Sequence, residues 1–253
     1  GPDNLFRIAL NKKLVSVSIR KRLKPKSNFN LLLLQNFINE VASFFSLGYG
    51  LYLALVNSPS DYQQGDAVRI MYIHVPSAWI ALSSYLLLGM CSFFFLIWRH
   101  PLAEIAARSI APIGTGFAAL TLITGSLWGK PIWGVWWVWD GRLTSMLILL
   151  FFFLGHLSLS NAFDRTERGA RPAAVLALVG CINLPVVKFS VDWWSTLHQP
   201  SSVNVFSKTT IHFTMLIPLG IMTAAFALFS LLIFLMKYNT ELIKIKNKGL
   251  DRL

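Results

Sequence analysis

The stretch VPSAWIALSSYLLLGMCSFFFLIW, from Val75 to Trp98, contains no Asp, Glu, Lys or Arg. As an α-helix it is long enough to cross the roughly 30 Å hydrocarbon core of a lipid bilayer. A helix is suited to that core because it satisfies its own backbone hydrogen bonds. The stretch therefore predicts a transmembrane helix.

The composition of the whole chain supports this interpretation. Hydrophobic residues make up 55% and charged residues 13%, and that charged share is about half the value of a typical soluble domain. The net charge of +12 does not indicate nucleic-acid binding, because the basic residues lie between apolar blocks and near the ends of the chain. Cys91 and Cys181 form no CxxC or CxxCH motif, so neither thiol exchange nor covalent haem attachment is indicated.

Six apolar blocks have the length of a membrane-spanning helix. We therefore expect an all-α membrane protein, a six-transmembrane-helix bundle, organised as a basic arm (1–36), a membrane domain (37–236) and a basic tail (237–253). The expected spans are Phe37–Val56, Val75–Trp98, Ser109–Leu127, Leu143–Phe163, Pro172–Val187 and Ile211–Met236.

The distribution of basic residues predicts the orientation. Eighteen of the 23 Lys and Arg lie in the arm, in the tail and in the connections on the same side. By the positive-inside rule, both termini face the cytoplasm of a bacterium or the matrix of a mitochondrion. The protein is then expected in the inner membrane, with three connections facing the periplasm or intermembrane space. The simplest role of the arm is to set topology and contact lipid, and binding of a soluble partner is the alternative.

The second outward connection is rich in tryptophan. Residues 128–142 read WGKPIWGVWWVWDGR and hold five of the nine tryptophans of the chain. Tryptophan is enriched at any membrane interface, which is the simpler explanation for an isolated pair such as Trp193 and Trp194. Five on one loop with glycine and proline favour a flat apolar ligand.

Two histidines flank this loop from the other outward connections. His74 lies at the mouth of the second expected span, and His198 lies in the third connection. Haem would suit both features, because its iron takes axial imidazoles, its ring packs on indole and its propionates pair with Arg142, Lys130 or Arg69. Each histidine has the alternative of an ordinary hydrogen-bonded interfacial residue.

Other polar residues have simpler explanations. His156 lies about 21 Å below Arg142 along a helix, whereas His212 starts the last span on the outer side, so the two are not expected to bracket one haem. Asp140 is either a proton acceptor or metal ligand, or else a charge partner of Arg142 or a helix-entry residue.

Missing features argue against two function classes. Gly125–Pro131 falls one residue short of a phosphate-binding loop and has proline where Ser or Thr is needed, so no ATPase is indicated. The apolar cores of the expected spans hold no Asp, Glu, Lys or Arg. A complete ion-coupled pump usually needs such groups along its path.

Three outward segments resemble a known family. WGKPIWGVWWVWDGRLTS resembles the WWD signature of the haem-handling membrane proteins of cytochrome c maturation. YQQGDAVRIMYIHVPSAW and VDWWSTLHQP resemble the segments that flank it. The length and expected span number are similar to the CcmC family rather than to the larger CcmF and CcsA. The resemblance covers about Ser58 to Pro200.

The resemblance implies a site and partners. It implies haem b held between axial ligands His74 and His198, and a WWD platform. It also implies loading of haem onto the chaperone CcmE, together with CcmD and the ABC transporter pair CcmA and CcmB. The platform residues by resemblance, with Arg142 added for its charge, are Trp128, Trp133, Trp136, Trp137, Trp139, Asp140 and Arg142.

Three functions stay open at this point. The first is a protein that binds and delivers haem without classical enzyme activity. The second is a haem ligase that forms the covalent haem–CcmE adduct, and the third is a subunit that transports haem across the membrane. A transporter predicts a polar path through the spans, and a ligase predicts variants that bind haem but form no adduct.

Overall fold

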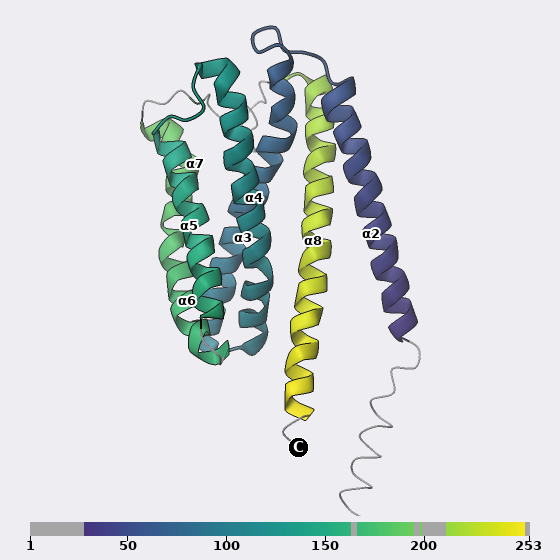
Figure 1. Cartoon of the computed structure of the whole chain (residues 1–253), viewed down its shortest axis with the longest axis vertical. Helices are drawn as coiled ribbons and strands as arrows, with labels where there is room; N and C mark the ends of the chain where they lie inside the picture. Colours follow the sequence, from purple (N-terminus) through teal and green to yellow (C-terminus); the bar gives the residue numbers. More distant parts are fainter. Residues whose placement is uncertain (1–27, 163–165, 195–197, 199–210, 251–253) are drawn as a thin grey trace, which may run out of the picture. The chain divides into compact units, whose positions relative to one another are not determined.

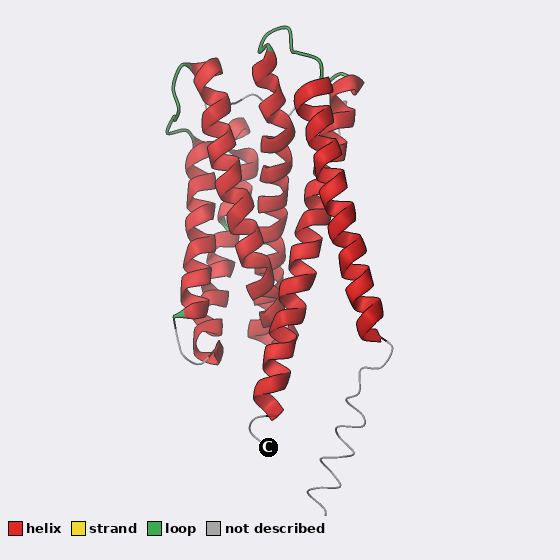
Figure 2. Cartoon of the chain, turned by 45° about the vertical axis from the view of Figure 1, so that its right-hand side comes forward, coloured by secondary structure: helices red, strands yellow, loops and turns green. Residues whose placement is uncertain are grey.

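A computed structural model describes residues 28–162, 166–194, 198 and 211–250. The chain divides into two compact units, Gly1–Val41 and Ala42–Leu253. The described part of the first unit is the beginning of helix α2, which runs over Asn28–Tyr52. The described part of the second unit is helical apart from loops and one isolated β-bridge between Asp61 and Gly65 (Figure 2).

The helices of the second unit follow the apolar blocks of the sequence. After α2 come a π-helical turn η1 and a 3₁₀ turn η2, and then six α-helices. The expected all-α fold is thus confirmed for the described residues. The bounds are η1 Leu53–Asn57, η2 Asp66–Ile70, α3 Met71–Trp98, α4 Pro101–Trp133, α5 Gly141–Asn161, α6 Thr166–Cys181, α7 Asn183–Trp193 and α8 Phe213–Leu250.

Five helical segments of the described chain are long and apolar enough to cross a membrane. They match the second to sixth expected spans, and the fourth segment, which matches the fifth expected span, is made of α6 and α7 together. The first expected span, Phe37–Val56, is helical but is not among the five, so the count of six remains a prediction. The five are Asp66–Trp98, Pro101–Trp133, Gly141–Asn161, Gly169–Trp193 and Phe213–Ile245.

Helix α3 has α4, α6 and α8 as packing neighbours. The connection from α3 to α4 is short because Arg99 adopts a left-handed conformation with φ of 51°, so the two helices form an antiparallel hairpin (Figure 1). We call the end where α4 finishes and α5 begins the tryptophan end. The end where α3 finishes and α4 begins is the opposite end.

Close helix packing depends on glycine at one point of the core. A Cβ atom at Gly114 of α4 would lie 2.1 Å from Cζ of Phe153 on α5, and Phe153 is fully buried. Its ring also contacts Tyr85 of α3, with the ring centroids 4.8 Å apart. In a membrane, where apolar burial gives little drive for association, such close contact stabilises the bundle by packing. The core therefore joins α3, α4 and α5.

Helix α4 is longer than expected at both ends. It begins at Pro101 instead of Ser109, so it includes Glu104 and Arg108, which form an ion pair one turn apart. It continues through Trp133, so the non-helical part of the expected loop 128–142 is only Gly134–Asp140. The helix ends at Gly134 because this residue adopts φ of 77° and donates its N–H to the Lys130 carbonyl.

Gly129 is a packing position rather than a turn. A Cβ atom there would lie 2.8 Å from Cε3 of Trp133, so the missing side chain makes room for the indole.

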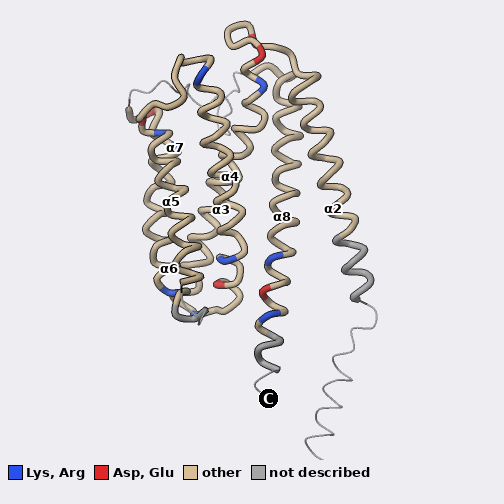
Figure 3. The backbone as a smooth tube through the Cα atoms, viewed as in Figure 1, with Lys and Arg blue, Asp and Glu red and all other residues tan. Residues whose placement is uncertain are grey.

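Charged residues gather toward the helix ends, and the stretches between them carry almost none (Figure 3). This is the distribution expected of membrane-spanning helices.

Candidate functional site

The tryptophan end brings His74 of α3 against α4. The His74 Nδ1 atom lies 3.1 Å from Oγ1 of Thr124. The Thr124 hydroxyl donates its own proton to the Leu120 carbonyl at 2.7 Å, so Nδ1–H of His74 donates to Thr124. This bond assigns the ring tautomer and leaves the imidazole lone pair on Nε2.

Two further residues of α4 fix the ring of His74. The ring centroids of His74 and Trp128 lie 5.7 Å apart in an edge-to-face arrangement. A Cβ atom at Gly125 would lie 3.0 Å from Cε1 of His74, so glycine at this position lets the helix approach the imidazole. Thr124 and Trp128 share this face because they are four residues apart on one helix.

The loop before α3 reaches the same indole. The Asp61 carboxylate accepts the backbone N–H groups of Gln63 and Gln64 at 2.9 and 2.8 Å, and Gly65 turns the chain with φ of 55°. The Gln64 side chain accepts the indole N–H of Trp128 at 3.0 Å. The segment before α3 and the tryptophan segment are therefore joined directly.

Asp140 has two roles at the start of α5. Its Oδ1 atom accepts the backbone N–H of Leu143 at 2.8 Å, which makes it the N-cap of the helix. Its Oδ2 atom accepts from Nδ1 of His198 at 2.7 Å. One carboxylate therefore both begins α5 and orients a histidine 58 residues further along the chain.

His198 is mostly buried, with 15% of its side chain exposed. Burial lowers the pKa of His198, because the charged imidazolium is poorly solvated there, and the hydrogen bond to Asp140 opposes this shift. Its ring lies edge-on to Trp133, with the centroids 4.7 Å apart. As at His74, the Nδ1–H donor leaves the lone pair on Nε2.

The two histidines, which are far apart in the sequence, lie near each other. His74 is close enough to His198 and to Arg142 for their charges to act on it. Arg142 donates to the Lys188 carbonyl of α7 at 3.4 Å and lies near Asp140 and Asp192. Helices α3, α4, α5 and α7 thus contribute to one site.

The remaining tryptophans of the loop are more peripheral. Trp137 contacts Trp139 at a centroid distance of 5.5 Å, and Lys130 lies 5.7 Å from the ring centroid of Trp136. Trp139 and Trp136 are 77% and 55% exposed. Large exposed indoles beside a histidine pair form an apolar surface that a ligand or partner can cover.

The tautomers of the two histidines suit metal ligation. Two imidazoles with hydrogen-bonded Nδ1 atoms and lone pairs on Nε2 are typical axial ligands. The histidines, the tryptophans and Asp140 were predicted as site residues from the sequence, whereas Thr124, Gly125 and Gln64 were not. The four-residue spacing of Thr124 and Trp128 could have indicated the first, and nothing in the sequence indicates Gln64.

Comparison with known proteins gives the family. A family model described as CcmC, heme exporter protein C, matches residues 22–251. Heme exporter protein C of Bradyrhizobium diazoefficiens is 48% identical over 210 residues, which cover 83% of this chain and 80% of that protein. A putative cytochrome c biosynthesis ccmC-like mitochondrial protein of Marchantia polymorpha is 44% identical over 194 residues, which cover 77% of this chain and 82% of that protein.

Heme exporter protein C of Escherichia coli strain K12 is also similar, with 45% identity over 162 residues that cover 64% of this chain and 66% of that protein. The matched range includes every segment that forms the site. The chain belongs to the heme exporter protein C family.

Proposed function

We propose that the protein binds haem b at the tryptophan end, with His74 and His198 as the two axial ligands, and delivers it during cytochrome c biogenesis. One observation carries the proposal: two histidines from distant segments lie near enough for the charge of one to act on the other, each with Nδ1 hydrogen-bonded and each beside an indole. The names of the relatives, which refer to heme export and cytochrome c biosynthesis, agree with it.

The two ligands have unequal partners. His198 donates to a carboxylate, whereas His74 donates to a neutral hydroxyl. A carboxylate partner makes an imidazole the stronger electron donor to a metal. His198 is therefore the firmer ligand and His74 the one that leaves iron more readily, which would suit a protein that must give its haem away.

The exposed indoles supply the surface around the haem. Trp128 and Trp133 lie against the histidines, and Trp136, Trp137 and Trp139 extend the aromatic surface outward. We assign the haem propionates to Arg142, because its charge acts on both histidines. The acceptor of haem is CcmE, and CcmD with the CcmA and CcmB pair completes the assembly.

The orientation follows from charge. With the basic arm and tail on the cytoplasmic or matrix side, the tryptophan end faces the periplasm or intermembrane space. Haem held there is on the side where c-type cytochromes are assembled.

Haem titration of the purified protein tests the proposal. His74→Ala and His198→Ala should each weaken haem binding by roughly tenfold or more, because metal sites depend on their ligands at least as strongly as on the groups that orient them. His212→Ala is the matched control, since this exposed histidine bonds locally to Thr214. Equal binding by all four proteins would contradict the proposal.

A second readout separates delivery from ligase activity. Arg142→Ala and Asp140→Asn are loaded with haem, and the transfer of haem to CcmE is followed. If the protein only holds haem, adduct formation falls in proportion to bound haem. If it acts as a ligase, a variant that keeps its haem yet forms no adduct is expected.

A further inference from the structure

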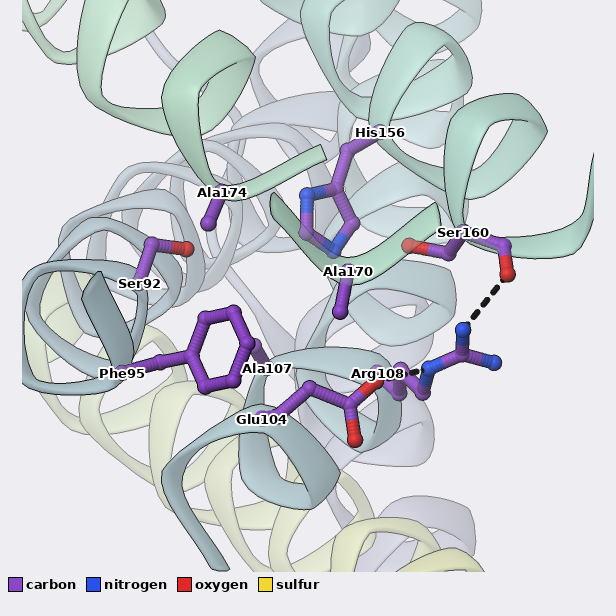
Figure 4. Close-up of a pocket in the computed structure, with 9 residues that line it drawn as sticks. All are labelled: Ser92, Phe95, Glu104, Ala107, Arg108, His156, Ser160, Ala170 and Ala174. Atoms are coloured by element: carbon purple, nitrogen blue, oxygen red, sulfur yellow. Dashed lines mark hydrogen bonds and ion pairs between the residues drawn. The ribbon is translucent and has the colours of Figure 1, made fainter. Parts of the chain in front are cut away.

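A second polar cluster lies at the opposite end, far from the histidine pair. His156 of α5 and Ser92 of α3 line a small pocket together with Glu104, Arg108 and Ser160 (Figure 4). At 1.5 Å per residue, Ser92 lies about 27 Å along α3 from His74. The cluster is therefore separate from the proposed haem site.

His156 presents a hydrogen-bond acceptor to this pocket. Its Nδ1 atom lies 3.0 Å from the Ala173 carbonyl, and a carbonyl only accepts, so Nδ1 carries the proton and Nε2 carries the lone pair. The side chain is 3% exposed. Nε2 is buried and has no hydrogen-bond partner among the described residues.

The hydroxyl of Ser92 also lacks a hydrogen-bond partner among the described residues. Ser77, on the same helix and equally buried, donates to the carbonyl four residues back at 2.6 Å. Ser92 is 1% exposed, and its Oγ atom has no partner among the described residues. An unpaired buried polar group is destabilising, so two in one pocket indicate a missing partner that both share.

The charges of the pocket are already paired. Glu104 forms an ion pair with Arg108, and Arg108 also donates to the Ser160 carbonyl, in the last turn of α5, at 2.5 Å. The described chain has no group of three His, Cys, Asp or Glu placed to hold a metal ion. The ligand of this pocket is therefore neutral and must both donate and accept hydrogen bonds.

The size of the pocket selects one molecule. Its cavity volume is about 10 Å³, which is close to the space that one water molecule needs. We infer that a single buried water binds here, donating to Nε2 of His156 and accepting from the hydroxyl of Ser92. It joins α3 to α5, the helices that carry His74 and Asp140 at the tryptophan end.

A double-mutant cycle in thermal unfolding tests the bridge. His156→Asn retains an N–H that can reach the Ala173 carbonyl but removes the Nε2 acceptor, and Ser92→Ala removes the hydroxyl. If one water joins the two groups, each change lowers Tm, and the double variant lowers it by clearly less than the sum of the two. The control cycle combines His156→Asn with Ser77→Ala in place of Ser92→Ala, and there the two changes in Tm should add.

Additive effects in the Ser92 cycle would overturn the inference. A structure of the wild-type protein that resolves ordered water tests it without relying on a variant that folds. Density for one water within hydrogen-bond distance of both His156 Nε2 and Ser92 Oγ supports the site. A dry pocket, with the Ser92 hydroxyl turned to its own helix, contradicts it.

Discussion

The two ends of the bundle use histidine in different ways. At the tryptophan end, His74 and His198 lie near each other, with indoles beside them and exposed indoles further out. At the opposite end, His156 is sealed among helices next to an ion pair. All three donate Nδ1–H, so the tautomer does not distinguish them. The surroundings of the ring distinguish them instead, with an aromatic surface at one end and a water-sized pocket at the other.

The largest expected effect is a change in the haem spectrum when His198 is removed. Removal of His156, at the opposite end, is the matched control. His198→Ala should convert bound haem from low-spin to high-spin, and added imidazole should restore the low-spin spectrum by filling the vacated position. His156→Ala should leave the spectrum of bound haem unchanged, because its ring lies at the other end. A haem spectrum that responds to the His156 substitution and not to the His198 substitution would contradict haem binding at the tryptophan end.

Asp140→Asn tests whether the carboxylate acts through His198. The amide still caps α5 through its oxygen, but one oxygen cannot replace the carboxylate that accepts from both Leu143 and His198. Loss of a group that orients a metal ligand typically costs about 10- to 100-fold in affinity. We expect a loss in that range and a higher reduction potential of the haem, both larger than with Thr124→Val. If the two variants change haem affinity and reduction potential equally, the claim that His198 is the firmer ligand is wrong.

Gly125→Ala tests the close approach of α4 to His74. The added methyl group lies 3.0 Å from Cε1 of the imidazole, so the ring must shift, at a cost of about 1–3 kcal/mol for an overpacked site. Gly116→Ala is the matched control on the same helix, because a Cβ atom there meets nothing within 4 Å. Haem titration of both variants should show weaker binding for Gly125→Ala alone.

The smallest effect is expected from Gln64→Ala. It removes the acceptor of the Trp128 indole N–H, and a single hydrogen bond contributes about 1 kcal/mol or less. Haem affinity should fall by a few-fold at most, with an unchanged spin state. A change of spin state would show that the loop before α3 controls the ligand itself.

The sequence predicted the membrane helices well where charge marks their ends. Trp98 ends α3 as expected because Arg99, His100 and Pro101 come directly after it. The start of α4 was predicted eight residues late because Glu104 and Arg108 neutralise each other within the helix, which composition does not reveal. The loop was predicted too long for a different reason, since Gly129 lies inside α4 and makes room for the ring of Trp133.

The histidines and tryptophans of the candidate site were predicted, but the residues that hold them in place were not. His74, His198 and the tryptophans stand out by residue type and by resemblance to a family. The partnership of Asp140 with His198 was not predicted, because it depends on how the fold brings His198 to the start of α5. Thr124 looks like any helical threonine until α3 places His74 against it.

The most direct test of the account is the visible absorption spectrum of the purified protein loaded with haem, recorded for the wild type beside His74→Ala and His198→Ala. The account predicts a low-spin bis-histidine spectrum for the wild type and a high-spin spectrum, or loss of haem, in either variant. A wild-type protein that takes up no haem, or one whose low-spin spectrum survives both substitutions, would contradict it.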